Sequence, residues 1–176
     1  MCTPSPLVAA ALALAIVGNT ALADTPNLGR PATPEELASW DISIAPDGAG
    51  LPPGRGSPRQ GEAVYVAKCL ACHGEKGAGK PNDALVGGRG TLAGDQAPIK
   101  TVGSFWPYAT TLFDYVRRAM PLNESKSLSN DEVYAVVAYI LLLNGIIGET
   151  EMIDAQALAK VRMPNADGFT PFARGR

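Results

Sequence analysis

Residues 69–73 of this 176-residue chain read CLACH, a C-x-x-C-H motif. Three chemistries use cysteines at this spacing: a thiol–disulfide redox pair, part of a zinc site, and covalent attachment of haem. A thioredoxin-like redox pair belongs in a βαβ unit, and no strand pattern is visible in the sequence. A structural zinc ion needs four ligands, but Cys2 is the only other cysteine or histidine in the chain. The motif therefore favours covalent haem attachment.

The spacing of the motif has a chemical reason. The thiols of Cys69 and Cys72 can reach the two vinyl groups on one edge of a porphyrin, and His73 then places its imidazole under the iron as the proximal ligand. A single motif predicts one haem and the transfer of one electron at a time. Because His73 is the only histidine in the chain, the opposite ligand cannot be a second histidine of this chain.

Methionine is the usual opposite ligand when histidine is missing, and it raises the reduction potential. We predict Met120, because it ends a helical stretch and Pro121 stops that helix and stiffens the following loop. Met163 also precedes a proline but lies in the tail, and Met152 lies in an acidic segment. Plain core packing is the alternative role for any of these methionines, and an open sixth position is a further alternative.

The N-terminus has the pattern of an export signal. Residues 7–17 are an uninterrupted apolar run, and residues 21–23 form an A-x-A cleavage site before Asp24. This pattern predicts a signal peptide over residues 1–23 and a periplasmic location. The run is shorter than the roughly 20 residues of a membrane span, so we expect no stable span after cleavage. An uncleaved anchor is the alternative.

Charge and composition narrow the function further. The chain has 15 Lys+Arg against 17 Asp+Glu, which excludes a strongly basic nucleic-acid-binding protein. Residues 24–58 carry two basic and five acidic side chains, residues 59–126 nine and six, and residues 127–176 four and six. A positive haem-bearing part could steer a negatively charged redox partner. An ordinary solvated surface is the alternative.

Helical signals occur over residues 58–69, 107–119 and 130–143. The first stretch carries Gly61 and Tyr65 on one face, where the glycine permits close approach of another helix. The second has a predicted buried stripe at helical spacing, formed by Leu112, Tyr115, Val116 and Ala119. Shorter helices are expected over residues 33–39 and around residues 153–160.

The third main helix has the clearest signals. Ser129 and Glu132 form a capping box at its start, and Gly145 marks its end. Residues 133–143 are apolar on every side, so this helix must be covered on more than one side. At 11 residues this run is too short to cross a bilayer. The cover must come from the tail, the haem or a partner protein.

The order of helix, haem motif, glycine-rich loop, helix, Met–Pro loop and terminal helix resembles the class I cytochrome c family over residues 58–147. The resemblance implies an all-α fold of three main helices around one covalent haem, with a Pro/Gly-rich arm over residues 24–57 and a second arm over residues 148–176. In this family a loop proline often supplies the carbonyl that accepts the proximal histidine's N–H. Asp83 stands at that position here, so the resemblance leaves the acceptor for His73 open, although some backbone carbonyl is expected to serve.

A narrower resemblance covers residues 28–56, 101–122 and 159–169. These stretches are similar to the SoxD-type cytochrome subunit of sulfane/sulfite dehydrogenases, which belong to the sulfur-oxidising (Sox) system. The resemblance implies a molybdenum-containing dehydrogenase subunit as electron donor and another cytochrome as acceptor. Well-known members carry two haem domains, whereas this chain carries one haem motif. It is therefore a shortened subunit or a relative that serves another dehydrogenase.

Three further residues are candidates for hydrogen bonds to a haem propionate. Trp106 and Tyr108 have polar tips on apolar bodies, and Arg89 carries a guanidinium group. Core packing at the start of the second helix is the alternative role for the two aromatic side chains.

We compare three function classes. An iron saturated by His73 and Met120 cannot bind substrate, which favours an electron-transfer subunit or a free soluble carrier rather than an enzyme. A haem enzyme, such as a peroxidase or a thiosulfate-oxidising cytochrome, needs an exchangeable sixth position, and no histidine is left for general acid–base chemistry. A gas-binding module is the third class. Rapid binding of cyanide or CO would favour an open site over the carrier.

Overall fold

The structure is a computed structural model that describes residues 28–169. The predicted signal peptide, residues 1–23, lies outside the described residues. The chain divides into two units, Met1–Asp41 and Ile42–Arg176. Within residues 28–169, no helix combines the length and the apolar character that crossing a membrane requires.

The described part of the N-terminal unit is organised around one short helix, α2 (Pro34–Trp40). Thr33 and Glu36 form the capping box that the sequence predicts, since each side chain accepts a hydrogen bond from the other residue's backbone N–H. The guanidinium group of Arg30 binds both carboxylate oxygens of Glu36, at 2.8 and 2.5 Å. No residue of α2 is buried.

The second unit, which we call the compact unit, is mainly helical, as the sequence predicts. In chain order its helices are α3 (Pro58–Lys68), α4 (Leu70–His73), α5 (Ala109–Ala119), α6 (Asn130–Leu143) and α7 (Ala155–Lys160), with 3₁₀ turns η1 (Glu75–Gly77) and η2 (Thr91–Ala93). The sequence places α6 correctly at both ends. It extends the first helix one residue too far and starts the second two residues too early.

A two-stranded sheet is the one departure from the all-helical expectation. Strand β1 (Arg55–Gly56) pairs antiparallel with strand β2 (Ile153–Asp154). The sequence shows no strand pattern here because two residues are too few for an alternation of apolar and polar side chains. The helix expected over residues 153–160 accordingly begins as this strand and becomes helical only at Ala155.

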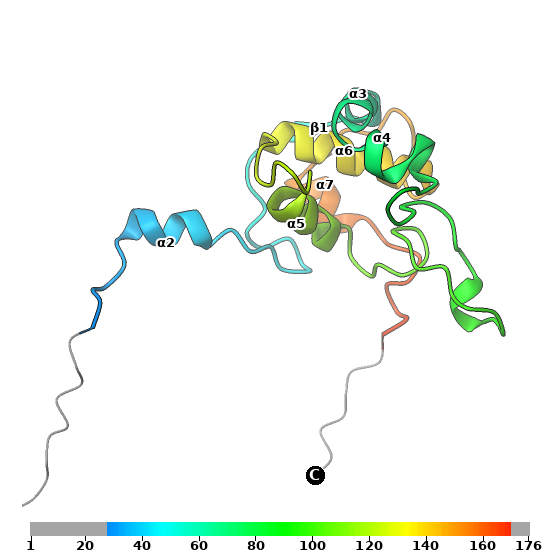
Figure 1. Cartoon of the computed structure of the whole chain (residues 1–176), viewed down its shortest axis with the longest axis horizontal. Coiled ribbons are helices and arrows are strands. Elements are labelled where there is room, and N and C mark those ends of the chain that lie inside the picture. Colours follow the sequence, from blue (N-terminus) through cyan, green and yellow to red (C-terminus); the bar gives the residue numbers. More distant parts are fainter. Residues whose placement is uncertain (1–27, 170–176) are drawn as a thin grey trace, which may run out of the picture. The chain divides into compact units, whose positions relative to one another are not determined.

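Helix α6 forms the centre of the compact unit, between α3 and α5 (Figure 1). All its residues from Val133 to Leu141 are buried. The tail helps to cover it, because Ile153 on β2 and Leu158 on α7 are each 1% exposed and belong to the same core. The tail therefore supplies part of the cover that the apolar helix α6 needs.

The crossing of α3 and α6 depends on glycine. A Cβ atom at Gly61 would lie 1.9 Å from the carbonyl oxygen of Ala135, and one at Gly56 would lie 2.3 Å from the backbone nitrogen of the same residue. The rings of Tyr65 and Tyr139 meet at the crossing, with centroids 5.4 Å apart. Glycine is needed at both positions, because a side chain at Gly61 would push α3 away from α6 and one at Gly56 would push β1 away from α6.

Segment 42–57 also packs on the compact unit through hydrogen bonds. The backbone N–H of Ile44 donates to the buried carboxylate of Asp114 at 3.2 Å. The hydroxyl of Thr110 donates to the carbonyl of Pro46 at 3.0 Å, and that of Tyr134 donates to the carbonyl of Pro52 at 2.8 Å. The part of the predicted N-terminal arm that follows Asp41 is thus held against α5 and α6.

Candidate haem-binding site

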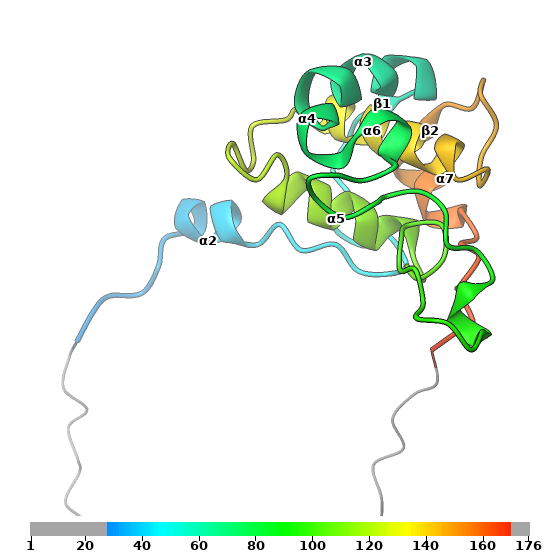
Figure 2. The ribbon, with the colours of Figure 1, turned by 45° about the vertical axis from the view of Figure 1, so that its right-hand side comes forward.

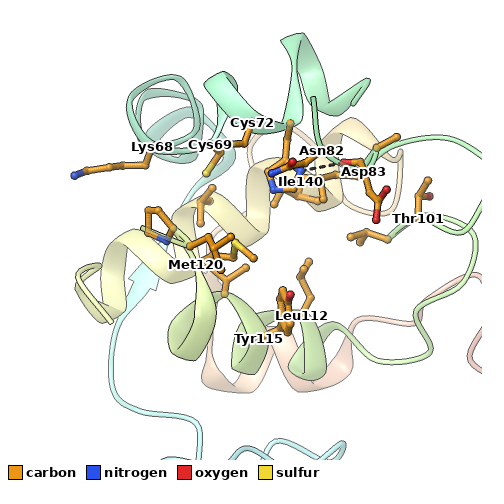
Figure 3. Close-up of a pocket in the computed structure, with 18 of the residues that line it drawn as sticks. Lys68, Cys69, Cys72, Asn82, Asp83, Thr101, Leu112, Tyr115, Met120 and Ile140 are labelled. Atoms are coloured by element: carbon orange, nitrogen blue, oxygen red, sulfur yellow. Dashed lines mark hydrogen bonds between the residues drawn. The ribbon is translucent and has the colours of Figure 1, made fainter. Parts of the chain in front are cut away.

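A cavity of about 450 Å³ lies between the end of α3 with α4 on one side and α5 on the other. Figure 2 shows α3 above α6 and α5 below it. All four predicted site residues line this cavity, namely Cys69, Cys72, His73 and Met120. Figure 3 shows Cys69 and Cys72 on one wall and Met120 on the facing wall. Met120 thus shares a cavity with the three motif residues, although it follows His73 by 47 positions in the sequence.

The local fold of residues 69–74 explains how the motif enters the cavity. Helix α3 ends at Lys68, and Cys69 (φ −120°, ψ −33°) is both the C-cap of α3 and the N-cap of the single turn of α4. Gly74 ends that turn with φ +73°, and a Cβ there would lie 2.3 Å from the carbonyl oxygen of Gly79. The hydroxyl of Tyr65 donates to the carbonyl of Gly74 at 2.8 Å. The motif is therefore held from both of its ends.

The imidazole of His73 has a hydrogen-bond partner on the loop that follows. Its Nδ1 lies 2.9 Å from the carbonyl oxygen of Asp83, drawn as a dashed line in Figure 3. This contact assigns the proton to Nδ1, because a carbonyl can only accept, and leaves Nε2 with a free lone pair. Asp83 stands where the family often has proline. A backbone carbonyl needs no particular side chain, so the departure leaves the contact intact.

The two thiols lie in unlike surroundings. Cys72 is exposed, whereas Cys69 is partly buried and packs against the core. Burial, with a smaller effect of the neighbouring Cys72, raises the pKa of the Cys69 thiol to about 11. A thioredoxin-like redox pair needs a lowered thiol pKa, so this environment argues against that chemistry. Residues 28–169 also contain no group of three or more His, Cys, Asp or Glu side chains that could hold a metal ion.

Met120 caps the C-terminal end of α5. Its backbone N–H donates to the carbonyl of Val116 at 3.1 Å, and its own conformation is extended, so the helix stops there. Pro121 after it is buried and also lines the cavity. The loop that follows is linked to the end of α3 by an ion pair of 2.9 Å between Lys68 and Glu124.

The other two methionines do not line the cavity. Met163 is 2% exposed and belongs to the hydrophobic core, and Met152 is 51% exposed on the surface. The structure thus assigns Met163 the packing role that the sequence left open for it.

The three candidates for propionate contacts separate in the structure. Trp106 lines the cavity and meets Tyr115 edge to face, with ring centroids 5.7 Å apart. Tyr108 and Arg89 do not line it. The guanidinium group of Arg89 donates instead to the carbonyl of Asn144 at 3.1 Å. Tyr115 corrects the predicted buried stripe, because it is 47% exposed and faces the cavity rather than the core.

Sequence reasoning missed Lys68 on α3 and four polar residues on loops that line the cavity. The four loop residues are Asn82, Lys100, Thr101 and Asn123. They lie in loops without helical or strand periodicity. No spacing rule connects such residues to the motif, so the folded chain alone brings them to the cavity. Thr101 begins the stretch 101–122 that resembles the SoxD-type cytochromes, and Lys100 directly precedes it. This resemblance is the one signal in the sequence that could have pointed to these two residues.

The cavity fits a haem group. Its volume lies within the roughly 300–1,000 Å³ of pockets for small molecules and cofactors. Most of its lining side chains are apolar and come from α5, α6 and the adjoining loops; they include Leu85, Val102, Leu112, Val116, Leu128, Val136 and Ile140. Two thiols, one imidazole and one thioether are the donor set that c-type haem uses.

Comparisons with known proteins agree with this reading. Residues 56–140 match the family model described as cytochrome c oxidase, cbb3-type, subunit III. A thiosulfate dehydrogenase from Allochromatium vinosum is 32% identical over 127 residues, which cover 65% of this chain and 46% of that protein. The chain thus spans about half the length of this curated relative.

A solved structure extends the likeness to most of the chain. A chain of the sulfane dehydrogenase SoxCD from Paracoccus pantotrophus matches with a TM-score of 0.79 and 41% identity, over 85% of this chain and 74% of that one. The protein described here therefore belongs to the cytochrome c family, whose cofactor is haem c, and is related to the SoxD-type cytochromes of sulfur dehydrogenases.

Proposed function

We propose that this protein is a periplasmic mono-haem c-type cytochrome that transfers single electrons as the cytochrome subunit of a sulfite or sulfane dehydrogenase. The observation that carries the proposal is the cavity itself. The thiols of Cys69 and Cys72, the imidazole of His73 and the thioether of Met120 all border this cavity. The two cysteines and Met120 lie on facing walls (Figure 3). The protein's role is electron transfer, and the oxidation of the sulfur compound belongs to a partner subunit.

Each residue has a definite task in this proposal. Cys69 and Cys72 would hold the haem by thioether bonds, and Nε2 of His73 and the thioether sulfur of Met120 would be the ligands of the iron. Bound haem supplies an iron that alternates between the ferric and ferrous states, so one electron enters or leaves at a time. The hydrogen bond from His73 Nδ1 to the carbonyl of Asp83 orients the ring and raises its basicity.

The apolar walls have a second task. Side chains of α5 and α6, such as Leu112, Val116 and Ile140, limit the access of water to the cavity. An apolar shell around a metal site influences its reduction potential. Methionine ligation raises the potential as well, which suits a protein that accepts electrons from a dehydrogenase.

The proposed partners are a molybdenum-containing dehydrogenase subunit and an acceptor cytochrome. Two observations support a protein partner. The related solved protein is the sulfane dehydrogenase SoxCD. The match covers 85% of this chain, whereas Ile42–Arg176 makes up about three quarters of it, so the likeness reaches into the N-terminal unit. There, Leu37 and Trp40 on α2 are 57% and 80% exposed.

The central experiment is expression of the full chain in a bacterium that matures c-type cytochromes in its periplasm. We expect one haem per chain that survives denaturation, and a visible spectrum of histidine–methionine ligation. We also expect a molybdenum-containing dehydrogenase to co-purify with the protein from its native source. A chain without covalent haem would overturn the proposal, and a haem-loaded protein that purifies alone would favour a free carrier.

The contribution of α2 to partner binding can be tested separately. The double variant Leu37→Ser, Trp40→Ser removes two exposed apolar side chains and should leave the haem spectrum unchanged. We expect it to reduce the amount of dehydrogenase that co-purifies. Substitution of Val66 by serine is the matched control, because this side chain of α3 is 57% exposed and does not line the cavity. Equal recovery of the partner with both variants would remove α2 from the proposed interface.

A second candidate function is thiosulfate oxidation at the haem itself, which the similarity to a thiosulfate dehydrogenase favours. That function requires an exchangeable sixth ligand in place of stable coordination by Met120. Rapid binding of cyanide together with turnover of thiosulfate by the purified protein would support this candidate. Slow cyanide binding without turnover would support the electron carrier.

A further inference from the structure

We propose that Asn144 is a positioning residue that holds the proximal histidine in place through the loop of residues 83–87. This inference rests on the proposed function, because it takes His73 as the haem ligand. Asn144 does not line the cavity. It lies at the C-terminal end of α6, on the element that forms the centre of the core.

The side-chain amide of Asn144 binds the loop on both sides of Val86. Its Oδ1 accepts a hydrogen bond from the backbone N–H of Gly87 at 3.2 Å, and its Nδ2 donates to the carbonyl of Leu85 at 3.1 Å. The same Nδ2 donates to the carbonyl of Ile140 at 2.9 Å. One amide group therefore ties the loop directly to the last turn of α6.

This loop carries the groups that reach the candidate haem site. Leu85 lines the cavity. Two residues earlier, the carbonyl of Asp83 accepts the hydrogen bond from His73 Nδ1 at 2.9 Å. Two residues is a short stretch of backbone, so a displacement of Leu85 is transmitted to the carbonyl of Asp83. Asn144 thus acts on His73 through the loop and without touching it.

The surroundings of Asn144 are built to keep the amide in place. A Cβ atom at Gly103 would lie 2.1 Å from Oδ1 of Asn144, so only glycine leaves room for the amide. The hydroxyl of Thr101 donates to the carbonyl of Gly87 at 2.6 Å and fixes the loop from the other side. The guanidinium group of Arg89 donates to the backbone carbonyl of Asn144 at 3.1 Å.

The physical consequence concerns the imidazole. A carbonyl that accepts the Nδ1 proton orients a ligating histidine and makes it a stronger electron donor. When the loop loosens, this hydrogen bond opens more often and the ligand becomes a weaker donor. A weaker donor favours the ferrous state, so the reduction potential rises. The Nδ1 proton also exchanges faster with solvent.

The test compares two uncharged variants of the haem-loaded protein, Asn144→Ala and Asn165→Ala. Asn165 is the matched control, because it lies on the tail, outside the loop of residues 83–87, and its Nδ2 donates to the carbonyl of Phe105 at 2.7 Å. Both variants lose an amide that binds the backbone, and both residues are partly buried. The readouts are the reduction potential and the exchange rate of the His73 Nδ1 proton in the reduced protein, measured by NMR.

We expect Asn144→Ala to speed this exchange on the order of tenfold, because both hydrogen bonds from the amide to the loop are lost, and to raise the potential. Asn165→Ala should change the exchange less than twofold and leave the potential unchanged. The backbone amide of Val137 in α6 reports global opening, and its exchange corrects for any loss of overall stability. Equal effects of the two variants, or no effect of either, would overturn the inference.

Misfolding of a variant and failure of the proposed function can each be distinguished from failure of this inference. If Asn144→Ala does not fold, Asn144→Asp replaces it, because this isosteric variant keeps the acceptor for Gly87 and loses both donors. Its exchange is again compared with that of an Asn165→Asp variant. If the wild-type chain carries no covalent haem, the proposed function fails. If it carries haem and the paired variants behave alike, only the role of Asn144 fails.

Discussion

The chain contains two Met–Pro pairs, and they lie in regions of opposite character. In the pocket region, which comprises the residues that line the 450 Å³ cavity, Met120 is partly buried and shares the cavity with His73. In the tail region, residues 148–169, Met163 is 2% exposed and belongs to the core. One thioether thus borders a cavity and the other is enclosed by packing. The same dipeptide can border a cavity or pack in the core, and the surrounding helices decide which.

The two regions also differ in how they are held. The tail region is attached by backbone pairing of β2 with β1 and by the buried side chains of Ile153 and Leu158. The pocket region borders loops that are held by individual polar side chains. Examples are the amide of Asn144, which binds the loop at Leu85, and the ion pair between Lys68 and Glu124. Changes in the tail should therefore alter stability, and changes around the pocket should alter the haem.

The largest expected effect is the loss of covalent haem from the pocket region. Replacement of both Cys69 and Cys72 by alanine removes the only two thiols available for thioether bonds near His73. We expect no haem to remain on the denatured chain, as judged by haem staining of a denaturing gel and by mass spectrometry. The variant Cys2→Ala, outside the predicted mature chain, should keep its haem. Covalent haem on the double variant would refute the attachment.

In the tail region, the largest effect should be on stability. Met163→Ala leaves a cavity in the core and should lower the free energy of unfolding by about 2–5 kcal/mol. Met152→Ala, at an exposed position of the same region, should change it by about 0.5 kcal/mol or less. Chemical denaturation of the haem-loaded proteins measures both. A changed haem spectrum of Met163→Ala at low denaturant would show that the tail region also affects the haem site, which contradicts the expected difference between the two regions.

The substitution of methionine by leucine compares the regions most directly, because the two side chains have similar volumes. Met120→Leu removes the proposed ligand, and the reduction potential should fall by on the order of 0.1 V. Met163→Leu should leave the potential unchanged. Potentiometric titration and the spectrum of the oxidised protein distinguish the two outcomes. An unchanged potential in Met120→Leu would exclude Met120 as the ligand.

The smallest expected effect concerns the ion pair between Lys68 and Glu124. Both side chains are largely solvated, at 42% and 50% exposed, and such pairs contribute little to stability and are screened by salt. We expect Glu124→Gln to shift the thermal midpoint by about 2 °C or less. The shift should vanish in about 1 M salt. A large, salt-independent loss would mean that Glu124 has a further structural role.

Much of the fold was predictable because its signals are local. The capping boxes at Thr33 and Ser129 join residues only three positions apart, and both form as expected. The bounds of α6 follow from its cap and its apolar run. Gly61 and Tyr65 predicted a close helix crossing, and the structure places Ala135 and Tyr139 there. The same local logic failed at Tyr115, since helical spacing does not distinguish a face toward the core from a face toward a cavity.

By itself, the sequence determined the helices and the list of methionines that could oppose His73, and it predicted covalent haem attachment at residues 69–73, because spacing and composition encode these. Only the tertiary structure decided which methionine borders the cavity, that Asp83 supplies the acceptor for His73, and that the tail covers α6. These contacts join residues far apart in the chain or depend on backbone atoms. No local pattern of side chains records such contacts, so they emerge only when the chain packs.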